Sequence, residues 1–183
     1  MDRKLIAIFV LVVAYPMSNV LGQELNRGGQ KPCAPISALA YEDGVPTVTL
    51  ESLLSEPHCY EGKFIRTYGF FRSGDEISEL FCLDCKSSEM IWLDFEEFYP
   101  ANKRCVAGGG NRDTFGKTVG FAALGVFRTG GGFGHLNASR HKFSVICIDE
   151  VTVLAKDWGV PQSLPDKTLR QMREWYKKAS EKY

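Results

Sequence analysis

β-branched and aromatic residues collect in five short segments of this chain, and glycine-rich or polar stretches separate them. The segments are residues 64–72, 78–83, 89–95, 117–130 and 143–154. Several short strands with turn signals between them are typical of a small barrel or sandwich. The pattern predicts a mainly β protein whose domain, residues 47–156, is a five-stranded OB-like barrel.

An internal similarity supports the barrel. The stretch "GKFIRTYGFFRSG" from Gly62 and the stretch "GKTVGFAALGVFRTG" from Gly116 begin and end alike. Each has a glycine near its middle, Gly69 or Gly125, where a strongly curved strand can bend without a side-chain clash. We interpret the two stretches as the first and fourth strands of the barrel.

Two helices are expected to flank these strands. Thr49 is a candidate N-cap for a short N-terminal helix that carries leucines at positions 50, 53 and 54, and Pro57 would end it. The C-terminal region 157–183 reads as a linker and an amphipathic helix. The apolar residues of that helix recur at steps of three and four: Leu169, Met172, Tyr176, Ala179 and Tyr183. The helix either packs on the barrel or docks a partner or an anionic surface.

The N-terminus has the layout of a secretory signal peptide. Arg3 and Lys4 precede an apolar run from Leu5 to Tyr15, and small residues near Gly22 suit cleavage. The run is too short to span a bilayer, which takes about 20 residues. Residues 1–22 are therefore expected to be a signal peptide and residues 23–46 a flexible lead-in. The mature chain would be exported to the periplasm or the outside of the cell, without a membrane span.

The charge balance argues against nucleic acid as a partner. The whole chain has 22 basic and 22 acidic residues, and removal of residues 1–22 leaves a net charge near −1. Proteins that bind nucleic acid draw most of their affinity from basic surfaces.

The six cysteines all lie beyond the expected signal peptide, which favours structural disulfides over metal ligation or redox chemistry. Cys82 and Cys85 have the spacing of a redox centre, but they follow a strand-like run. In an extended chain they would lie about 10 Å apart, too far for a mutual disulfide. We expect each to bond a different partner among the remaining cysteines, which are Cys33, Cys59, Cys105 and Cys147.

The expected function is a binding or interaction module whose ligand is a protein, a glycan or a small molecule. OB barrels bind ligands on the face of strands two and three and on the neighbouring loops. The candidate ligand-binding residues are Arg66, Tyr68, Trp92, Phe133 and His135. No cofactor, metal or catalytic constellation is expected.

Two alternatives remain open. One is a metal-dependent hydrolase that uses His135, His141 and a carboxylate, and the other is a single-stranded oligonucleotide binder. Asn137 begins an Asn-Ala-Ser acceptor pattern for glycosylation, which matters if the source organism glycosylates exported chains.

Several of these stretches together resemble a group of small, uncharacterised exported bacterial proteins with an OB-like barrel. The stretches are "YEGKFIRTYGFF", "IWLDF", the second "GK…GVF" and "GFGHL", and the similarity spans about residues 46–154. The resemblance implies the barrel and export, and it supplies no catalytic residues. The chain departs from that pattern in its cysteines, its 99–117 loop and its basic C-terminal helix.

Overall fold

The protein is described by a computed structural model, which covers residues 33, 41–42, 44–95, 114–155 and 164–183. Its strands are β1 (Tyr41–Glu42), β2 (Val45–Pro46), β3 (Phe64–Ser73), β4 (Ser78–Phe81), β5 (Ile91–Asp94), β6 (Thr118–Phe133) and β7 (Ser139–Ala155). Its helices are α1 (Leu50–Ser55), α3 (Asp166–Lys182) and the single-turn 3₁₀ helices η2 (Pro57–Cys59) and η3 (His135–Asn137). The expected signal peptide, most of the lead-in and most of the 99–117 loop lie outside these residues.

Strands β3 to β7 form a closed barrel in the order β3-β4-β5-β7-β6, in which β5 and β7 run parallel and the other pairs antiparallel. The predicted mainly β fold with a five-stranded barrel is confirmed. β3 and β6 are the first and fourth barrel strands, as their similar sequences predicted, and they pair with each other from Phe64↔Val126 to Arg72↔Thr118. β1 and β2 form a separate two-stranded ladder at the end of the expected lead-in.

The barrel interior is filled by large apolar side chains. Phe71, Phe121, Phe127 and Phe143 are fully buried in one cluster, together with aliphatic residues from every barrel strand. Helix α1 closes part of this core, because Leu50 and Leu53 of the helix belong to the same cluster. The N-cap of α1 is Thr49, as predicted, whose hydroxyl accepts a hydrogen bond from the Ser52 amide at 3.2 Å.

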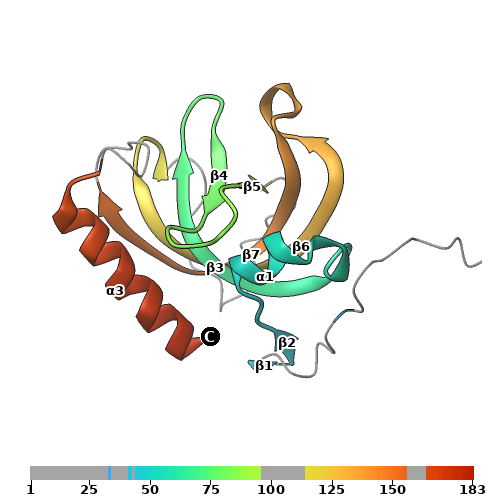
Figure 1. The fold of residues 1–183 in the computed structure, drawn as a ribbon, viewed down its shortest axis with the longest axis horizontal. Coiled ribbons are helices and arrows are strands. Elements are labelled where there is room, and N and C mark those ends of the chain that lie inside the picture. The colour runs from blue at the N-terminus through green and yellow to red at the C-terminus, as the bar shows by residue number, and fades with distance from the viewer. Residues whose placement is uncertain (1–32, 34–40, 43, 96–113, 156–163) are drawn as a thin grey trace, which may run out of the picture. The chain divides into compact units, whose positions relative to one another are not determined.

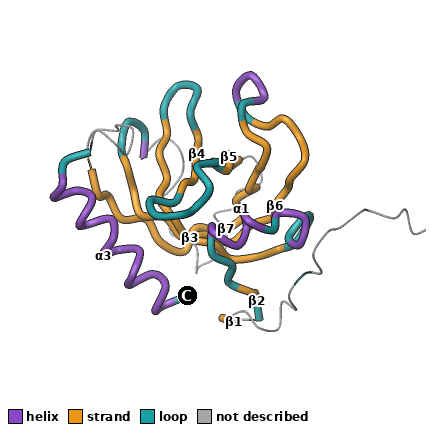
Figure 2. Tube along the Cα trace, in the orientation of Figure 1, coloured by secondary structure: helices purple, strands orange, loops and turns teal. Residues whose placement is uncertain are grey.

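Helix α3 packs against the outside of the barrel (Figures 1 and 2). Its buried residues Met172, Trp175 and Ala179 lie against a second apolar cluster that includes Tyr68, Phe70, Phe81 and Ala122 of the barrel. We call this contact the helix-covered surface. Of the two expectations for the C-terminal helix, packing on the barrel is the one found.

Two contacts fix α3 in place. The indole of Trp175 sits directly on Gly120 of β6, where a Cβ atom would lie 2.4 Å from the ring. The indole nitrogen donates to Glu150 of β7 at 2.9 Å, and the Lys182 ammonium donates to the same carboxylate at 2.8 Å. Burial of a side chain such as Trp175 stabilises the fold by about 1.5–3 kcal/mol.

The structure contains the disulfides Cys33–Cys59 and Cys82–Cys85, and Cys147 is also disulfide-bonded, to a partner outside the described residues. The expectation that Cys82 and Cys85 bond different partners is wrong. It assumed an extended chain, but β4 ends at Phe81 and the following residues bend. The bend brings the two Cα atoms to 5.5 Å, within the range of a disulfide.

Candidate functional site

Two connections flank the outer face of β4 and β5, the strands that carry ligands in OB barrels. They are the β3–β4 turn, residues 74–77, and the β6–β7 turn, residues 134–138, which project at the upper edge of Figure 1. An ion pair joins them, because His135 Nε2 lies 3.3 Å from Glu76 Oε2. Both side chains are largely exposed, so the pair orients the turns more than it stabilises the fold.

Trp92 packs against the β6–β7 turn. Ile91 and Leu93 of β5 point into the core, so Trp92 points outward between its register neighbours Glu79 and Lys142. The backbone of Gly134 lies against the indole, and a Cβ atom there would approach Cε3 to 2.2 Å. Gly134 also has φ of 73°, so both its conformation and its contact require glycine.

Phe133 lies at the end of β6 next to a second ion pair. The Lys142 ammonium is 5.9 Å from the Phe133 ring centroid and 2.8 Å from the Asp94 carboxylate. Three of the candidate ligand-binding residues, Trp92, Phe133 and His135, therefore lie around one turn. A cavity of about 190 Å³ lies beside them, lined by residues that include Glu79, Met90 and Arg140.

The sequence analysis missed the most exposed apolar side chain of this turn. Leu136 is 85% exposed, and its backbone is left-handed, with φ of 54° and ψ of 23°. Asn137 beside it has φ of 58° and is also exposed, which leaves its acceptor pattern accessible. The available signal was that Leu136 is an apolar residue between two polar ones, His135 and Asn137, in the glycine-rich stretch "GGGFGHLNAS". We define the turn face as Trp92, Phe133, His135, Leu136 and Asn137.

Arg66 and Tyr68 do not join the turn face. Both are 3% exposed, because α3 covers their part of β3. Arg66 pairs with Asp149 at 3.0 Å, and the Tyr68 ring packs on Tyr176 and Tyr183 of the helix region. Burial also raises the pKa of the Tyr68 hydroxyl. The five candidates therefore do not form one exposed face, and ligand binding by Trp92, Phe133 and His135 stays a prediction.

His135 and His141 have different surroundings. His141 is buried, stacks on Phe127, and is hydrogen-bonded to Thr129 at 2.8 Å and Glu89 at 3.1 Å. The only group of three potential metal ligands within the described ranges is Cys33, His58 and Cys59. Its two sulfur atoms are bonded to each other, which removes them as thiolate ligands. The hydrolase hypothesis stays an untested prediction.

The chain was compared with protein-family models, with curated proteins and with solved structures, and none of the three comparisons gave a match. In the described part of the chain, no helix is long and apolar enough to cross a membrane.

Proposed function

We propose that this chain is an exported binding module that docks a protein partner through the turn face. Export is supported by the signal-like N-terminus and by the disulfides, which persist in oxidising compartments. The observation that carries the docking role is Leu136, an apolar side chain held almost fully in water in a conformation that leucine disfavours.

Leu136 contributes little to the stability of the isolated barrel. Its side chain is 85% exposed, so it gains little from apolar burial. A left-handed backbone costs a residue with a Cβ atom about 1–2 kcal/mol. Local strain of this kind collects at sites of recognition, where the surrounding structure holds the residue in place.

The turn that presents Leu136 is held from two sides. Gly134 rests on the Trp92 indole, and His135 reaches Glu76 of the neighbouring turn. A preorganised apolar residue loses less conformational entropy on binding, which favours affinity. The Gly134 backbone also covers part of the Trp92 ring, which leaves less of the ring for stacking on a sugar or a base. A protein with an apolar socket therefore fits this face better than a glycan or a nucleic acid.

A displayed library of random peptides tests the proposal, with the mature protein as bait. Peptides enriched by the wild-type protein should bind Leu136→Asp at least about tenfold more weakly, because a central apolar contact often dominates an interface. The matched control is Val153→Asp, which makes the same kind of change at an exposed residue far along β7 from the turn. Lack of enrichment, or equal binding to Leu136→Asp, would contradict the proposal.

A further inference from the structure

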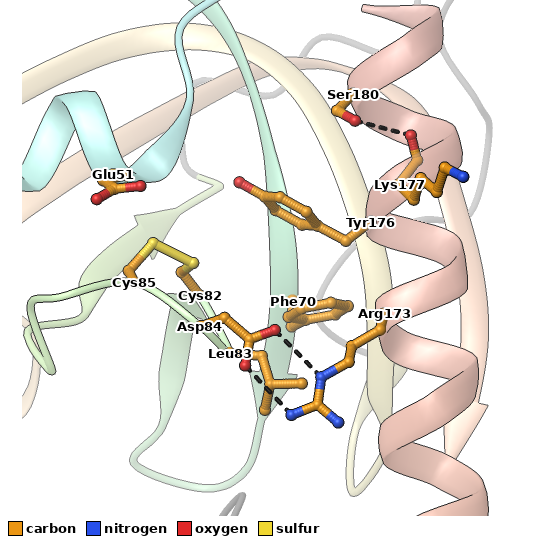
Figure 3. A pocket seen from close by; sticks show the side chains of 10 residues that line it. All are labelled: Glu51, Phe70, Cys82, Leu83, Asp84, Cys85, Arg173, Tyr176, Lys177 and Ser180. Carbon is orange, nitrogen blue, oxygen red and sulfur yellow. Dashed lines mark hydrogen bonds and ion pairs between the residues drawn. A yellow bond between two sulfur atoms is a disulfide. The ribbon is translucent and has the colours of Figure 1, made fainter.

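A second cavity lies between α3 and the Cys82–Cys85 loop, which follows β4 at the opposite end from the 74–77 turn. It does not depend on the proposed function of the turn face. Its volume is about 450 Å³, within the range of small-ligand sites. We call it the disulfide pocket (Figure 3). The loop contributes one wall, α3 the opposite wall, and Phe70 of β3 part of the floor.

The walls of the disulfide pocket are fixed without a ligand. The disulfide holds the 82–85 loop in a tight bend, with Cα atoms 5.5 Å apart. Asp84, at the tip of this loop, accepts two hydrogen bonds from the Arg173 guanidinium of α3, at 3.2 and 3.3 Å. The pair spans the pocket from loop to helix, as Figure 3 shows. A pocket that exists before binding loses little entropy when it is filled.

The interior of the pocket is apolar and aromatic. The Phe70 and Tyr176 rings lie 5.9 Å apart, and Leu83 and the two disulfide sulfur atoms face the same space. Aromatic rings attract cations over their faces. This lining suits the apolar body of a ligand and also tolerates a positive charge close to the rings.

The polar groups that remain for a ligand lie toward α1. Figure 3 shows the Tyr176 hydroxyl pointing from α3 toward Glu51 and the disulfide. Among the described residues, neither the Glu51 carboxylate nor the Tyr176 hydroxyl has a hydrogen-bond or ion-pair partner. Burial, with added contributions from Tyr68 and Glu51, raises the pKa of Tyr176 to about 12, so its hydroxyl keeps its proton at neutral pH.

The described cationic side chains around the pocket do not form ion pairs with the Glu51 carboxylate. The Arg173 guanidinium is occupied by Asp84, and the Lys177 ammonium points away from the disulfide in Figure 3. Lys86 lines an adjoining cavity of about 420 Å³, which also borders Glu51 and Cys85. Glu51 therefore lies where the two cavities meet, and it forms no ion pair with a described lysine or arginine.

We propose that the disulfide pocket binds small amphipathic cations. The ammonium group of the ligand meets the Glu51 carboxylate, and its apolar body lies on Tyr176, Leu83 and the disulfide. The Tyr176 hydroxyl is left to donate to an acceptor on the same ligand.

Three probes of similar size test this ligand class: 2-phenylethylammonium, the neutral 2-phenylethanol, and the anionic 3-phenylpropanoate. Binding is followed by backbone amide chemical shifts of the mature, disulfide-bonded protein at constant ionic strength. The cation should bind at least about tenfold more tightly than the other two, as expected for a charged hydrogen bond. Its shifts should map to residues of the loop and of α3 that line the pocket.

Glu51→Gln should remove this preference, with about a tenfold loss for the cation and little change for the alcohol. Glu51 is exposed, so the variant should fold, and an unchanged melting curve checks this. Glu181→Gln is the matched control, because it makes the same charge change on an exposed position of α3 outside the pocket. Leu136→Asp should leave cation binding intact, which separates this site from the turn face.

Three results would overturn the proposal. They are equal binding of the three probes, full cation affinity in Glu51→Gln, and absence of binding by any probe up to about 10 mM. Ser180→Trp provides an independent check of location, because Ser180 lines the pocket and an indole there would fill it. If the cation bound this variant as well as the wild-type protein, it would be occupying another site.

Discussion

The helix-covered surface and the turn face lie on the same barrel but differ in the burial of their large side chains. Under α3, Tyr68 and Trp175 are buried, and the Trp175 indole nitrogen has the Glu150 carboxylate as its acceptor. At the turn face, Leu136 stands in water with a left-handed backbone. Tyr68 and Trp175 stabilise the fold by their burial under the helix. Leu136 at the turn is exposed and adds little to stability. The difference is the physical basis for the proposal that the turn recognises a partner.

Trp175→Ala should give the largest effect on stability. Truncation of a buried tryptophan costs about 3–5 kcal/mol, and this one also removes one of the hydrogen-bond donors to Glu150. Urea denaturation followed by circular dichroism measures the free energy of unfolding. Trp92→Ala, at the half-buried tryptophan of the turn face, should cost clearly less.

Equal losses for the two tryptophans would contradict the division of the barrel into a stabilising surface and a recognition surface. Hydrogen exchange of the α3 amides adds a check on the cause. In Trp175→Ala these amides should lose protection before the barrel amides do, because the helix is held mainly by its contacts with the barrel.

The barrel could be predicted from sequence because each strand has a local signature. The five predicted segments match β3 to β7, although β4 ends two residues earlier than expected and β7 begins four residues earlier. The repeated stretches from Gly62 and Gly116 also identified the first and fourth strands, which are adjacent in the barrel. Local composition and turn residues were enough for these assignments.

The helix-covered surface could be predicted only in part. The spacing of apolar residues in α3 predicted an amphipathic helix, but the predicted apolar positions omitted Trp175. Trp175 lies three residues after Met172 and four before Ala179, so it fits the same spacing. A helix packed on a sheet buries a wider arc than one residue per turn. β3 is consequently buried on both faces from Ile65 to Ser73. Arg66 was a ligand candidate in the sequence analysis because its cover, which includes the Tyr183 ring, comes from a distant part of the chain.

Trp92, Phe133 and His135 of the turn face were candidates from the sequence, but Leu136 and the disulfide pocket could not be predicted because they depend on backbone conformation. Left-handed geometry at Leu136 has no signature in the sequence, since leucine is a poor residue for it. The Cys82–Cys85 bond depends on a bend immediately after β4, which an extended-strand assumption excludes. The disulfide pocket forms because of that bend and the packing of α3 against the barrel. Neither the sequence of the loop nor that of the helix alone predicts it.

Acidification should loosen the helix-covered surface. Burial pushes the pKa of Glu150 up, but hydrogen bonds from Lys182, Trp175 and Thr152 outweigh burial and leave the pKa below its ordinary value. A pKa that is lower in the folded state gives a stabilisation that is present above the unfolded value, about 4.3, and is lost as the pH falls through the folded value. The free energy of unfolding should therefore decrease when the pH is lowered below about 4.

Urea denaturation across this pH range checks the role of Glu150. Glu150→Gln should be less stable than the wild-type protein at neutral pH and should approach it in acid, because the glutamine has no charge to lose. Glu76→Gln is the control at the turn face, where the exposed pair with His135 contributes little to stability. If the stability of Glu150→Gln changed with pH in parallel with that of the wild-type protein, the Glu150 carboxylate would not contribute to holding α3 on the barrel.

The smallest expected effect has the opposite sign and concerns Leu136. In Leu136→Gly the backbone strain of about 1–2 kcal/mol is relieved, and the added entropy of the unfolded glycine offsets about 0.5–1 kcal/mol of it. The variant should thus be more stable than the wild-type protein by about 0.5 kcal/mol, measured by urea denaturation, while it loses the peptide binding that requires the leucine side chain. Asn137→Gly is the matched control, since asparagine already tolerates the left-handed conformation and little strain remains to be relieved. Destabilisation by Leu136→Gly would mean that the leucine supports the turn, and its exposure would then no longer argue for a partner.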